Sequence, residues 1–397
     1  MTRHNAIPVS LVAFGHFVLE TCSNFLPVVY PLLIPVMGLT YAQIGLLALV
    51  LGVGASAAQP IFGLWSDRWS AWKIAPLGVA WIGLFLGAVG LLTSYYWLVL
   101  VVAVGALGAA AFHPAGATIA YAGGGRRRGV AVSIFSVGGN LGAAFSPLAI
   151  SMVIGKFGLA GTTVLIPAAL GSGLLIYRRL GTIARREAPV AQDAPAQPAR
   201  DAPAGWLVGL SLIVVAMMAR SWFQVGLVTY LPTWVQAHGY GITLGGQMLF
   251  AFLVSVGAGS LTGGALSDYI GRWSVLTLGL GLLGPAYWVY LNASTIAGLT
   301  TLLIVMGVLI GFTFPVSIVL AQDIWPRRVG LASALVMGLG WAPGGMGASV
   351  TGLLADVVSL DYGLRWLIIA PMVGLAALLT FGVLRRRGAQ AIVQTPI

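Results

Sequence analysis

The chain has 397 residues, of which 59% are hydrophobic and only 7% carry a charge, and its mean hydropathy is +0.97. An ordinary soluble domain carries about 25% charged residues, because its surface faces water. The composition therefore excludes an ordinary soluble protein and predicts a surface that faces lipid. The formal net charge of +11 does not indicate a nucleic-acid partner, because the basic residues lie in short segments between apolar stretches.

At about 20 apolar residues per span, the chain has room for roughly twelve membrane-crossing helices. Helices are expected because open strands would leave backbone groups unpaired in hydrocarbon. No small-residue cleavage site follows the first residues, so we expect the first span to be retained and not to be a signal peptide. The predicted spans are 8–36, 41–64, 74–93, 96–121, 130–153, 160–178, 206–236, 241–266, 273–292, 295–321, 330–355 and 363–384.

A polar segment rich in Ala and Pro divides the predicted spans into two groups of six. It covers residues 179–205 and cannot cross a membrane, so it predicts a flexible loop between two halves. We therefore expect an N-terminal six-helix bundle at 1–178, a cytoplasmic linker at 179–205, and a C-terminal six-helix bundle with a short cytoplasmic tail at 206–397.

The basic residues predict the orientation in the membrane. With both termini in the cytoplasm, only Lys156, Arg220 and Arg365 of the 20 basic residues lie outside the predicted cytoplasmic segments. Enrichment of Lys and Arg in cytoplasmic loops is the strongest sequence signal for topology. The sequence thus predicts a multi-pass protein of the plasma (inner) membrane with both termini cytoplasmic.

The two halves repeat each other at an offset of 201 residues. Gly63 and Asp67 of the first half match Gly264 and Asp268 of the second, and Pro114 matches Pro315. Related six-helix halves are typical of transporters that move one half against the other, with the solute site at the interface between the halves, near the membrane midplane.

Two short motifs carry a resemblance to a known family. Residues 63–68 (Gly-Leu-Trp-Ser-Asp-Arg) resemble the loop motif between helices two and three of the major facilitator superfamily, and residues 264–272 resemble its second-half echo. The resemblance implies the twelve-helix fold of that family, an all-α membrane protein of two pseudo-symmetric bundles. It also implies that four charged residues bias the conformational equilibrium and act in gating: Asp67, Arg68, Asp268 and Arg272.

A narrower resemblance covers most of the chain. The pattern is similar to the fosmidomycin-resistance branch, whose members are regarded as proton-coupled efflux pumps. The sequence departs from that branch at Leu19-Glu20, where Asn-Asp would be expected, so a carboxylate is retained on a longer side chain. The segments that carry the resemblance are His16 with Glu20, 30–33 (Tyr-Pro-Leu-Leu), 59–60 (Gln-Pro), 112–114 (Phe-His-Pro), 133–142, 321–323 (Ala-Gln-Asp), Pro326, 329–330 (Val-Gly) and 344–347 (Gly-Gly-Met-Gly).

Polar residues within the predicted spans are the candidate functional residues. An ionisable side chain at mid-span costs about 2.5–3.5 kcal/mol or more, so such residues are functional candidates by default. His16, Glu20 and Asn24 recur at i, i+4 and i+8 and therefore share one helix face. We expect proton coupling by Glu20, His16 and His113. The expected solute-binding residues are Arg220, Gln224, Asn24, Asn140 and Gln59.

The leading hypothesis is a proton-coupled antiporter that exports a small drug or metabolite, with Arg220 attracting an anionic or polar solute. The alternatives are a facilitator or proton-coupled importer of a small organic solute, a static Glu20–Arg220 ion pair, and a packing role for His113 beside the Pro114 kink.

We expect no enzyme activity and no catalytic residue, no P-loop or cofactor, and no metal site, since four histidines and one cysteine are dispersed along the chain. The expected partners are a small-molecule substrate, protons and membrane lipid, with the chain acting as a monomer.

Overall fold

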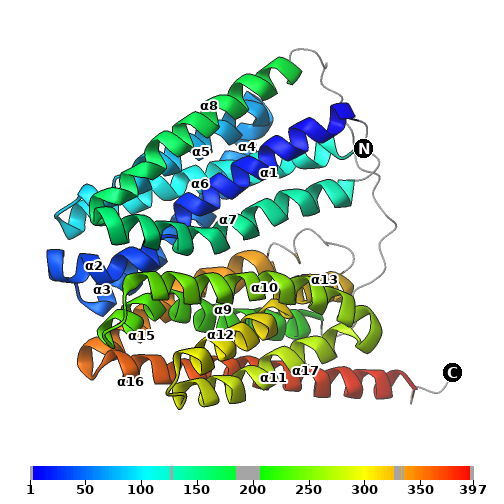
Figure 1. Cartoon of the computed structure of the whole chain (residues 1–397). Coiled ribbons are helices and arrows are strands. Elements are labelled where there is room, and N and C mark those ends of the chain that lie inside the picture. Colours follow the sequence, from blue (N-terminus) through cyan, green and yellow to red (C-terminus); the bar gives the residue numbers. More distant parts are fainter. Residues whose placement is uncertain (1–2, 126–127, 185–205, 326–331, 333–334, 394–397) are drawn as a thin grey trace. The chain divides into compact units, whose positions relative to one another are not determined.

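The computed structural model describes residues 3–125, 128–184, 206–325, 332 and 335–393, and this part of the chain is helical without a strand (Figure 1). The expected all-α membrane fold is therefore confirmed. Eleven of the described helical segments are long and apolar enough to cross a membrane. Residues 185–205, which form most of the predicted linker, lie outside the described residues.

The described residues form two compact units. The first comprises those of Met1–Gln192 together with Thr229–Phe250, and the second comprises those of Asp193–Val228 and Ala251–Ile397. Residues 229–250 thus group with the first unit. They include the end of the helix Trp206–Ala237 and the start of the helix Ile242–Ile270. The predicted domain boundaries at 178 and 206 stay a prediction.

The first unit contains the helices of the N-terminal half. Within it, α1 packs against α5, α6, α7 and α8 and carries the polar face discussed below (Figure 1). The elements are α1 (Arg3–Ser23), α2 (Leu26–Met37), α3 (Tyr41–Ala57), α4 (Gln59–Trp69), α5 (Ala71–Gly87), η1 (Val89–Leu91), α6 (Tyr95–Gly123), α7 (Arg128–Phe157), η3 (Leu159–Val164) and α8 (Leu165–Ala184).

The C-terminal half is likewise built of long helices, which are interrupted at different positions. Its core holds large aromatic side chains such as Phe223 and Tyr287, whose rings meet edge to face with centroids 4.8 Å apart. The elements are α9 (Trp206–Ala237), α10 (Ile242–Ile270), α11 (Arg272–Leu291), α12 (Ile296–Gly311), α13 (Phe314–Ile324), the π-helix η5 (Leu335–Leu339), α15 (Gly340–Val357), α16 (Leu360–Arg365), η6 (Trp366–Ile368) and α17 (Ile369–Val393).

Several predicted spans are broken helices. The span 8–36 consists of α1 and α2, which separate at Asn24 because Pro27 lies in the first turn of α2. The span 295–321 breaks between α12 and α13, where Pro315 again follows the break. At these breaks, backbone polar groups lose their hydrogen-bond partners within the helix. Candidate site residues, such as Asn24, lie close to them.

The predicted span 330–355 corresponds to η5 followed by α15. Residues 326–331 and 333–334 lie outside the described residues, so apart from Ala332 this segment is described only from its π-helical turn onward. A π-turn inserts an extra residue into a helix and often occurs at functional positions. Here it directly precedes the glycine-rich segment that packs against α9.

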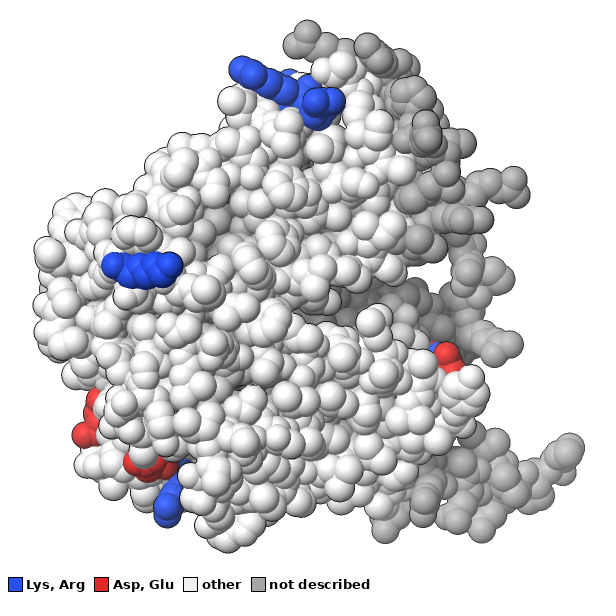
Figure 2. All heavy atoms as spheres, in the orientation of Figure 1, with Lys and Arg blue, Asp and Glu red and all other residues white. Residues whose placement is uncertain are grey.

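The surface has the character expected of a lipid-facing protein. On the face shown in Figure 2, charged side chains occur at only a few points of the described surface, and the other described residues there are uncharged. Many large apolar side chains are exposed on the described helices, including Leu261 on α10 and Leu353 on α15. Such exposure would be costly in water and is natural in hydrocarbon.

Candidate functional site

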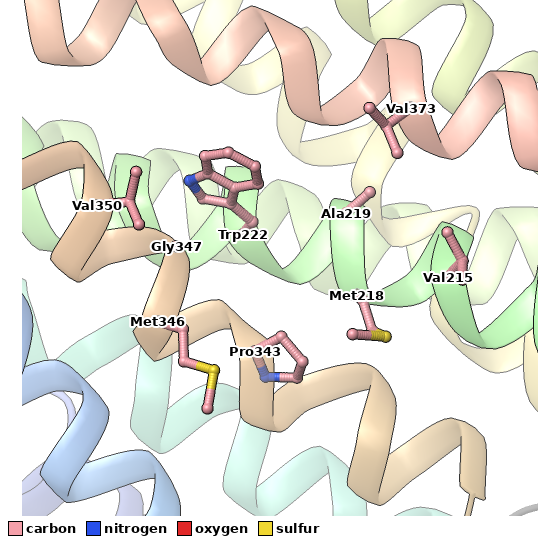
Figure 3. Close-up of a pocket in the computed structure, with 9 residues that line it drawn as sticks. All are labelled: Val215, Met218, Ala219, Trp222, Pro343, Met346, Gly347, Val350 and Val373. Carbon is pink, nitrogen blue, oxygen red and sulfur yellow. The ribbon is translucent and has the colours of Figure 1, made fainter.

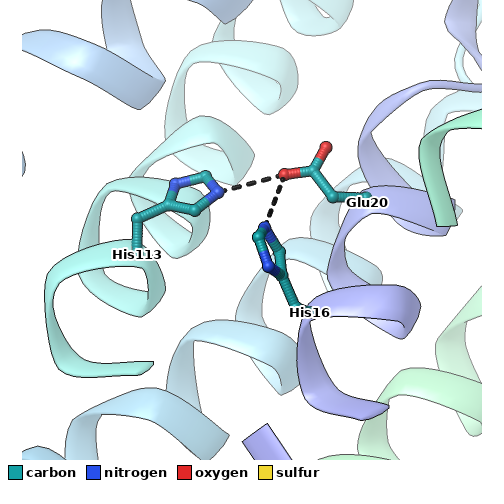
Figure 4. A group of neighbouring side chains, drawn as sticks. All are labelled: His16, Glu20 and His113. Carbon is teal, nitrogen blue, oxygen red and sulfur yellow. Dashed lines mark hydrogen bonds and ion pairs between the residues drawn. The ribbon is translucent and has the colours of Figure 1, made fainter. Parts of the chain in front are cut away.

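One face of α1 carries a carboxylate whose two oxygens have different partners. Asn24 donates a hydrogen bond from Nδ2 to Oε2 of Glu20 at 2.7 Å, one helical turn away. The other oxygen, Oε1, faces two imidazole rings (Figure 4). The predicted i, i+4, i+8 face is therefore a set of interacting side chains, and Asn24 supplies an amide beside the carboxylate.

The second helix of this cluster is α6. His113 lies directly before Pro114, and its Nε2 is 3.0 Å from Oε1 of Glu20. His16 on α1 approaches the same oxygen, with its Nε2 at 3.5 Å. Figure 4 shows both rings pointing at one oxygen from two helices. The histidines appear dispersed in the sequence, but the fold brings two of them together, with ring centroids 5.3 Å apart.

A third helix, α7, holds the His16 ring in place. Nδ1 of His16 donates a hydrogen bond to the backbone carbonyl of Phe135 at 2.9 Å, and the Phe135 ring stacks on the imidazole with centroids 4.2 Å apart. One turn further along α7, a Cβ at Gly139 would collide with the imidazole. The glycine-rich segment of α7 thus makes room for a candidate site residue.

The C-terminal half has a polar cluster of a different kind, centred on α9. Arg220 is only 2% exposed and donates from Nε to Oγ1 of Thr313 at 2.9 Å and from an Nη to Oε1 of Gln224 at 2.6 Å. The Phe314 ring lies 5.3 Å from the centre of the guanidinium. The predicted pair Arg220 and Gln224 is therefore brought together and is joined by two residues at the break between α12 and α13.

The two clusters occupy related places in the repeat. A Cβ at Gly139 would meet His16, and at the position 201 residues later a Cβ at Gly340 would lie 3.0 Å from Met217. Met217 thus takes the place of His16, and by the same offset Ser221 takes the place of Glu20. The halves share the packing but differ in chemistry, with an acid and two imidazoles in one and a guanidinium in the other.

Two predicted solute-binding residues lie elsewhere among the described contacts. Gln59, at the start of α4, donates its amide to the carbonyl of Ala55 at 2.9 Å. Asn140 is exposed on α7. Neither joins the clusters around Glu20 or Arg220 in the structure, so their roles in binding solute stay a prediction.

The four predicted gating residues lie at helix ends. Asp67 and Arg68 fall in the last turn of α4, and their side chains lie outside the described part. Asp268 is exposed near the end of α10. Arg272, the first residue of α11, forms an ion pair with Asp323 near the end of α13. This pair links the segment 264–272 to the segment 321–323, two stretches that carried the family resemblance.

An apolar groove of about 310 Å³ lies in the second unit between α9, α15 and α17. Its walls include Met218, Trp222, Met346 and Val373, and no charged side chain lines it (Figure 3). Arg220 and Gln224 lie on the same helix α9 but outside the groove. The predicted polar residues and the described groove are therefore separate features of this unit.

Both the chemistry and the fold define a class of protein. Apolar helices that bury a few ionisable side chains among themselves mark a pathway for ions or solutes through a membrane. An oxygen shared by two imidazoles can hold a proton, and a buried guanidinium can bind an anionic group. The structure is that of a helical multi-pass membrane protein with such polar sites in each half.

The comparisons identify the family within that class. The family model described as Major Facilitator Superfamily matches residues 12–345. The chain belongs to the Major Facilitator Superfamily, a family of membrane transporters.

Individual relatives agree with this assignment. The chain is 27% identical over 367 residues to the fosmidomycin resistance protein of Escherichia coli (strain K12), an alignment that covers 92% of this chain and 90% of that protein. The fold is similar to a bacterial homolog of the human lysosomal transporter Spinster, solved in an inward-facing and occupied conformation. That match has a TM-score of 0.79 at 16% identity and covers 98% of each chain. A D-xylose–proton symporter matches with a TM-score of 0.70 at 15% identity, covering 95% of this chain and 97% of that one.

Proposed function

We propose that the chain is a secondary active transporter that exports a small anionic solute in exchange for protons across the plasma (inner) membrane. Glu20 carries the proton, His16 and His113 pass it on, and Arg220 with Gln224 binds the anionic group of the solute. The observation that carries this proposal is the shared oxygen of Glu20, which faces two imidazole nitrogens inside an otherwise apolar bundle.

The hydrogen bond of His16 to α7 supports a proton-binding role for the cluster. Because Nδ1 donates to the Phe135 carbonyl, the Nε2 of a neutral His16 carries a lone pair directed at a carboxylate oxygen 3.5 Å away. Two lone pairs repel each other unless a cation lies between them. A proton on either group removes this repulsion, so the cluster supports protonation during the transport cycle.

The partners of Glu20 support antiport over symport. Its oxygens contact His16, His113 and Asn24, all within the first unit. Proton binding at Glu20 therefore needs no direct exchange with a solute anion at Arg220. Loading of proton and solute in alternate steps is what exchange requires, whereas a Glu20 that released Arg220 on protonation would favour symport.

Arg220 supports an anionic solute. A guanidinium stays charged when buried and presents a planar fork that matches a carboxylate or phosphonate. Its contacts to Gln224 and Thr313 orient that fork. The relative in Escherichia coli is described by resistance to fosmidomycin, which makes a phosphonate the first solute to test.

The test is a flux measurement in proteoliposomes. Protein is reconstituted with labelled fosmidomycin, and solute movement is followed with a pH gradient of either direction and with none. Antiport predicts that solute accumulates on the side that is more acidic at the start. Accumulation on the opposite side would support proton-coupled import, and flux that ignores the gradient would support a facilitator; either result would refute the proposal.

A further inference from the structure

The cluster of His16, Glu20 and His113 has the geometry of a transition-metal site. We propose that it binds one divalent ion of the zinc class, through Nε2 of each histidine and Oε1 of Glu20. This inference does not depend on proton coupling or on the direction of transport, because it concerns an equilibrium binding site. It departs from the sequence expectation that the histidines are too dispersed to hold a metal.

The spacing of the donor atoms suits a small cation. In a tetrahedral zinc site with bonds of about 2.0–2.2 Å, neighbouring ligand atoms lie roughly 3.3 Å apart. Here the two distances from Oε1 of Glu20 are 3.0 Å to His113 and 3.5 Å to His16, and all three donor atoms lie within 4.8 Å of one another. A small closure of the two imidazoles would bring all three donors onto one ion.

The groups behind the donors are those that metal ligands require. Metal-binding histidines usually donate their other ring nitrogen to a carbonyl or carboxylate, and metal-binding carboxylates are themselves hydrogen-bonded. His16 donates Nδ1 to the Phe135 carbonyl at 2.9 Å, which turns the lone pair of Nε2 toward Glu20. Asn24 holds Oε2 of Glu20 at 2.7 Å and leaves Oε1 to face the rings. Two of the three ligands are thus oriented before any ion binds.

The donor set points to the kind of ion. Two imidazoles and one carboxylate are a combination found at zinc sites, whereas Ca²⁺ and Mg²⁺ prefer oxygen ligands alone. Cys22, six residues after His16 on α1, is buried against α5: a Cβ at Gly83 would lie 3.4 Å from its Sγ. The thiol is therefore not part of the set, and a three-ligand ion keeps one position for water or an anion.

His113 is the less constrained ligand. Its Nδ1 is buried without a hydrogen-bond partner among the described residues, so the contact with Glu20 is the one hydrogen bond that orients the ring there. His16, by contrast, is held by a hydrogen bond, by stacking on Phe135 and by the space at Gly139. Loss of the preoriented His16 should therefore weaken binding at least as much as loss of His113.

Binding is tested on purified full-length protein without a polyhistidine tag. Zn²⁺ is titrated by calorimetry, and Co²⁺ is used as a spectroscopic probe, because its visible absorption is strong when it is four-coordinate and weak when it is six-coordinate. We expect one ion per chain and a strong Co²⁺ band. Because the ligands come from α1 and α6, the ion should also raise the Tm of the protein, since it binds the folded state alone.

Variants decide whether this cluster is the site. His16→Gln, His113→Gln and Glu20→Gln should each lower the Zn²⁺ affinity by at least tenfold and abolish the Co²⁺ band. Asn24→Ala, which removes only the group behind Glu20, should lower the affinity by about tenfold. The matched controls are His238→Gln, an exposed histidine near the end of α9, and Cys22→Ser; both should bind as the wild type does.

Three results would overturn the proposal. These are no saturable Zn²⁺ binding by the wild type, equal affinity in the wild type and the two histidine variants, and loss of binding in the His238→Gln control. Melting curves without metal show whether each variant is folded. If the protein does not bind Zn²⁺, the proposal of proton-driven flux still stands. If solute flux ignores the pH gradient, the proposal of metal binding still stands, so the two proposals can be tested separately.

Discussion

At the scale of single residues, Glu20 has two distinct environments within one side chain. Oε2 accepts from the amide of Asn24 and fixes the carboxylate plane, while Oε1 is left to the two imidazoles. A side chain one methylene shorter at this position would not reach as far from α1. The longer glutamate, where the related branch would have an aspartate, is therefore part of how the helix α1 reaches the ring of His113 on α6.

The first prediction concerns the charge of Glu20. Glu20→Gln keeps the shape and an oxygen beside Asn24 but cannot exchange a proton. We expect proton-driven flux to be abolished, whereas exchange of labelled for unlabelled solute without a gradient remains measurable. Both are measured in proteoliposomes that contain equal amounts of protein. Full gradient-driven transport by Glu20→Gln would remove this residue from the coupling step.

The second prediction concerns the fork of Arg220. Arg220→Lys keeps a positive charge but loses the planar pair of donors, so binding of an anionic solute should weaken by roughly tenfold, or about 1.4 kcal/mol. The measurement is solute affinity by calorimetry or by binding to detergent-solubilised protein. Arg365→Lys, an exposed arginine on α16, is the control and should change nothing. Unchanged affinity in Arg220→Lys and Arg220→Ala would take Arg220 out of the binding site.

Part of the candidate site was predictable from residue spacing alone. In a helix, an interval of four residues puts His16, Glu20 and Asn24 on one face, and the same interval joins Arg220 to Gln224. Contacts of Phe135 and Thr313 could not be predicted, because a backbone carbonyl and a threonine at a helix break carry no distinctive signal in the sequence. Gln59 and Asn140 show the same limit, since spacing does not say how a separate helix is rotated about its axis.

At the scale of elements, the glycine-rich segment of α7 sets the distance between α7 and α1. A Cβ at Gly138 would collide with the carbonyl of Ala13, and a Cβ at Gly139 would collide with the His16 ring. Close approach of backbones at small residues is the usual way in which membrane helices associate. This approach also brings the Phe135 carbonyl within reach of His16, so packing and site geometry depend on the same contact.

The third prediction tests that contact. Gly139→Ala adds one methyl group against the imidazole, and overpacking of this kind costs about 1–3 kcal/mol. We expect a lower Tm, measured by thermal unfolding in detergent, together with weakened proton coupling. Gly171→Ala on α8 is the matched control, because a Cβ there meets no atom within 4 Å. Equal behaviour of the two variants would show that the His16 ring does not depend on Gly139.

The helix breaks were harder to predict than the helices. Hydropathy indicates where a span begins and ends, but it does not reveal where the helix axis changes direction within the span. Pro27 and Pro315 do mark the two breaks, yet Pro114 lies inside a continuous α6 and Pro232 inside a continuous α9. A proline permits a break in a membrane helix, and the surrounding helices decide whether it occurs.

At the scale of the whole molecule, composition and the two motif segments were sufficient for the fold class and the family. The charge-poor composition requires a lipid-facing helical protein, and the family model confirms the superfamily. The solute and its direction do not follow from the same signals, because one fold serves many solutes and both directions. Those properties depend on a few polar side chains, which are too few to change the composition.

The fourth prediction concerns gating. Asp268 is exposed near the end of α10, and we expect it to bias the conformational equilibrium without touching the solute. Asp268→Asn should change the transport rate at saturating solute, with less than a twofold change in affinity, and Asp67→Asn should do the same. Asp361→Asn at the start of α16 serves as the control. A large loss of affinity with a normal maximal rate would place these residues at the solute site instead.

The matched packing of Gly139 with His16 and of Gly340 with Met217 has an evolutionary consequence. If the halves descend from one duplicated gene, each inherited the same scaffold, and the acid–imidazole chemistry was kept or acquired on one copy only. Position Phe314 corresponds to His113 by the same offset. Combining Met217→His, Ser221→Glu and Phe314→His would copy the first cluster onto the second scaffold. Such a triple variant tests whether the helices of the second half can hold the acid–imidazole cluster of the first half, or whether Arg220 prevents this.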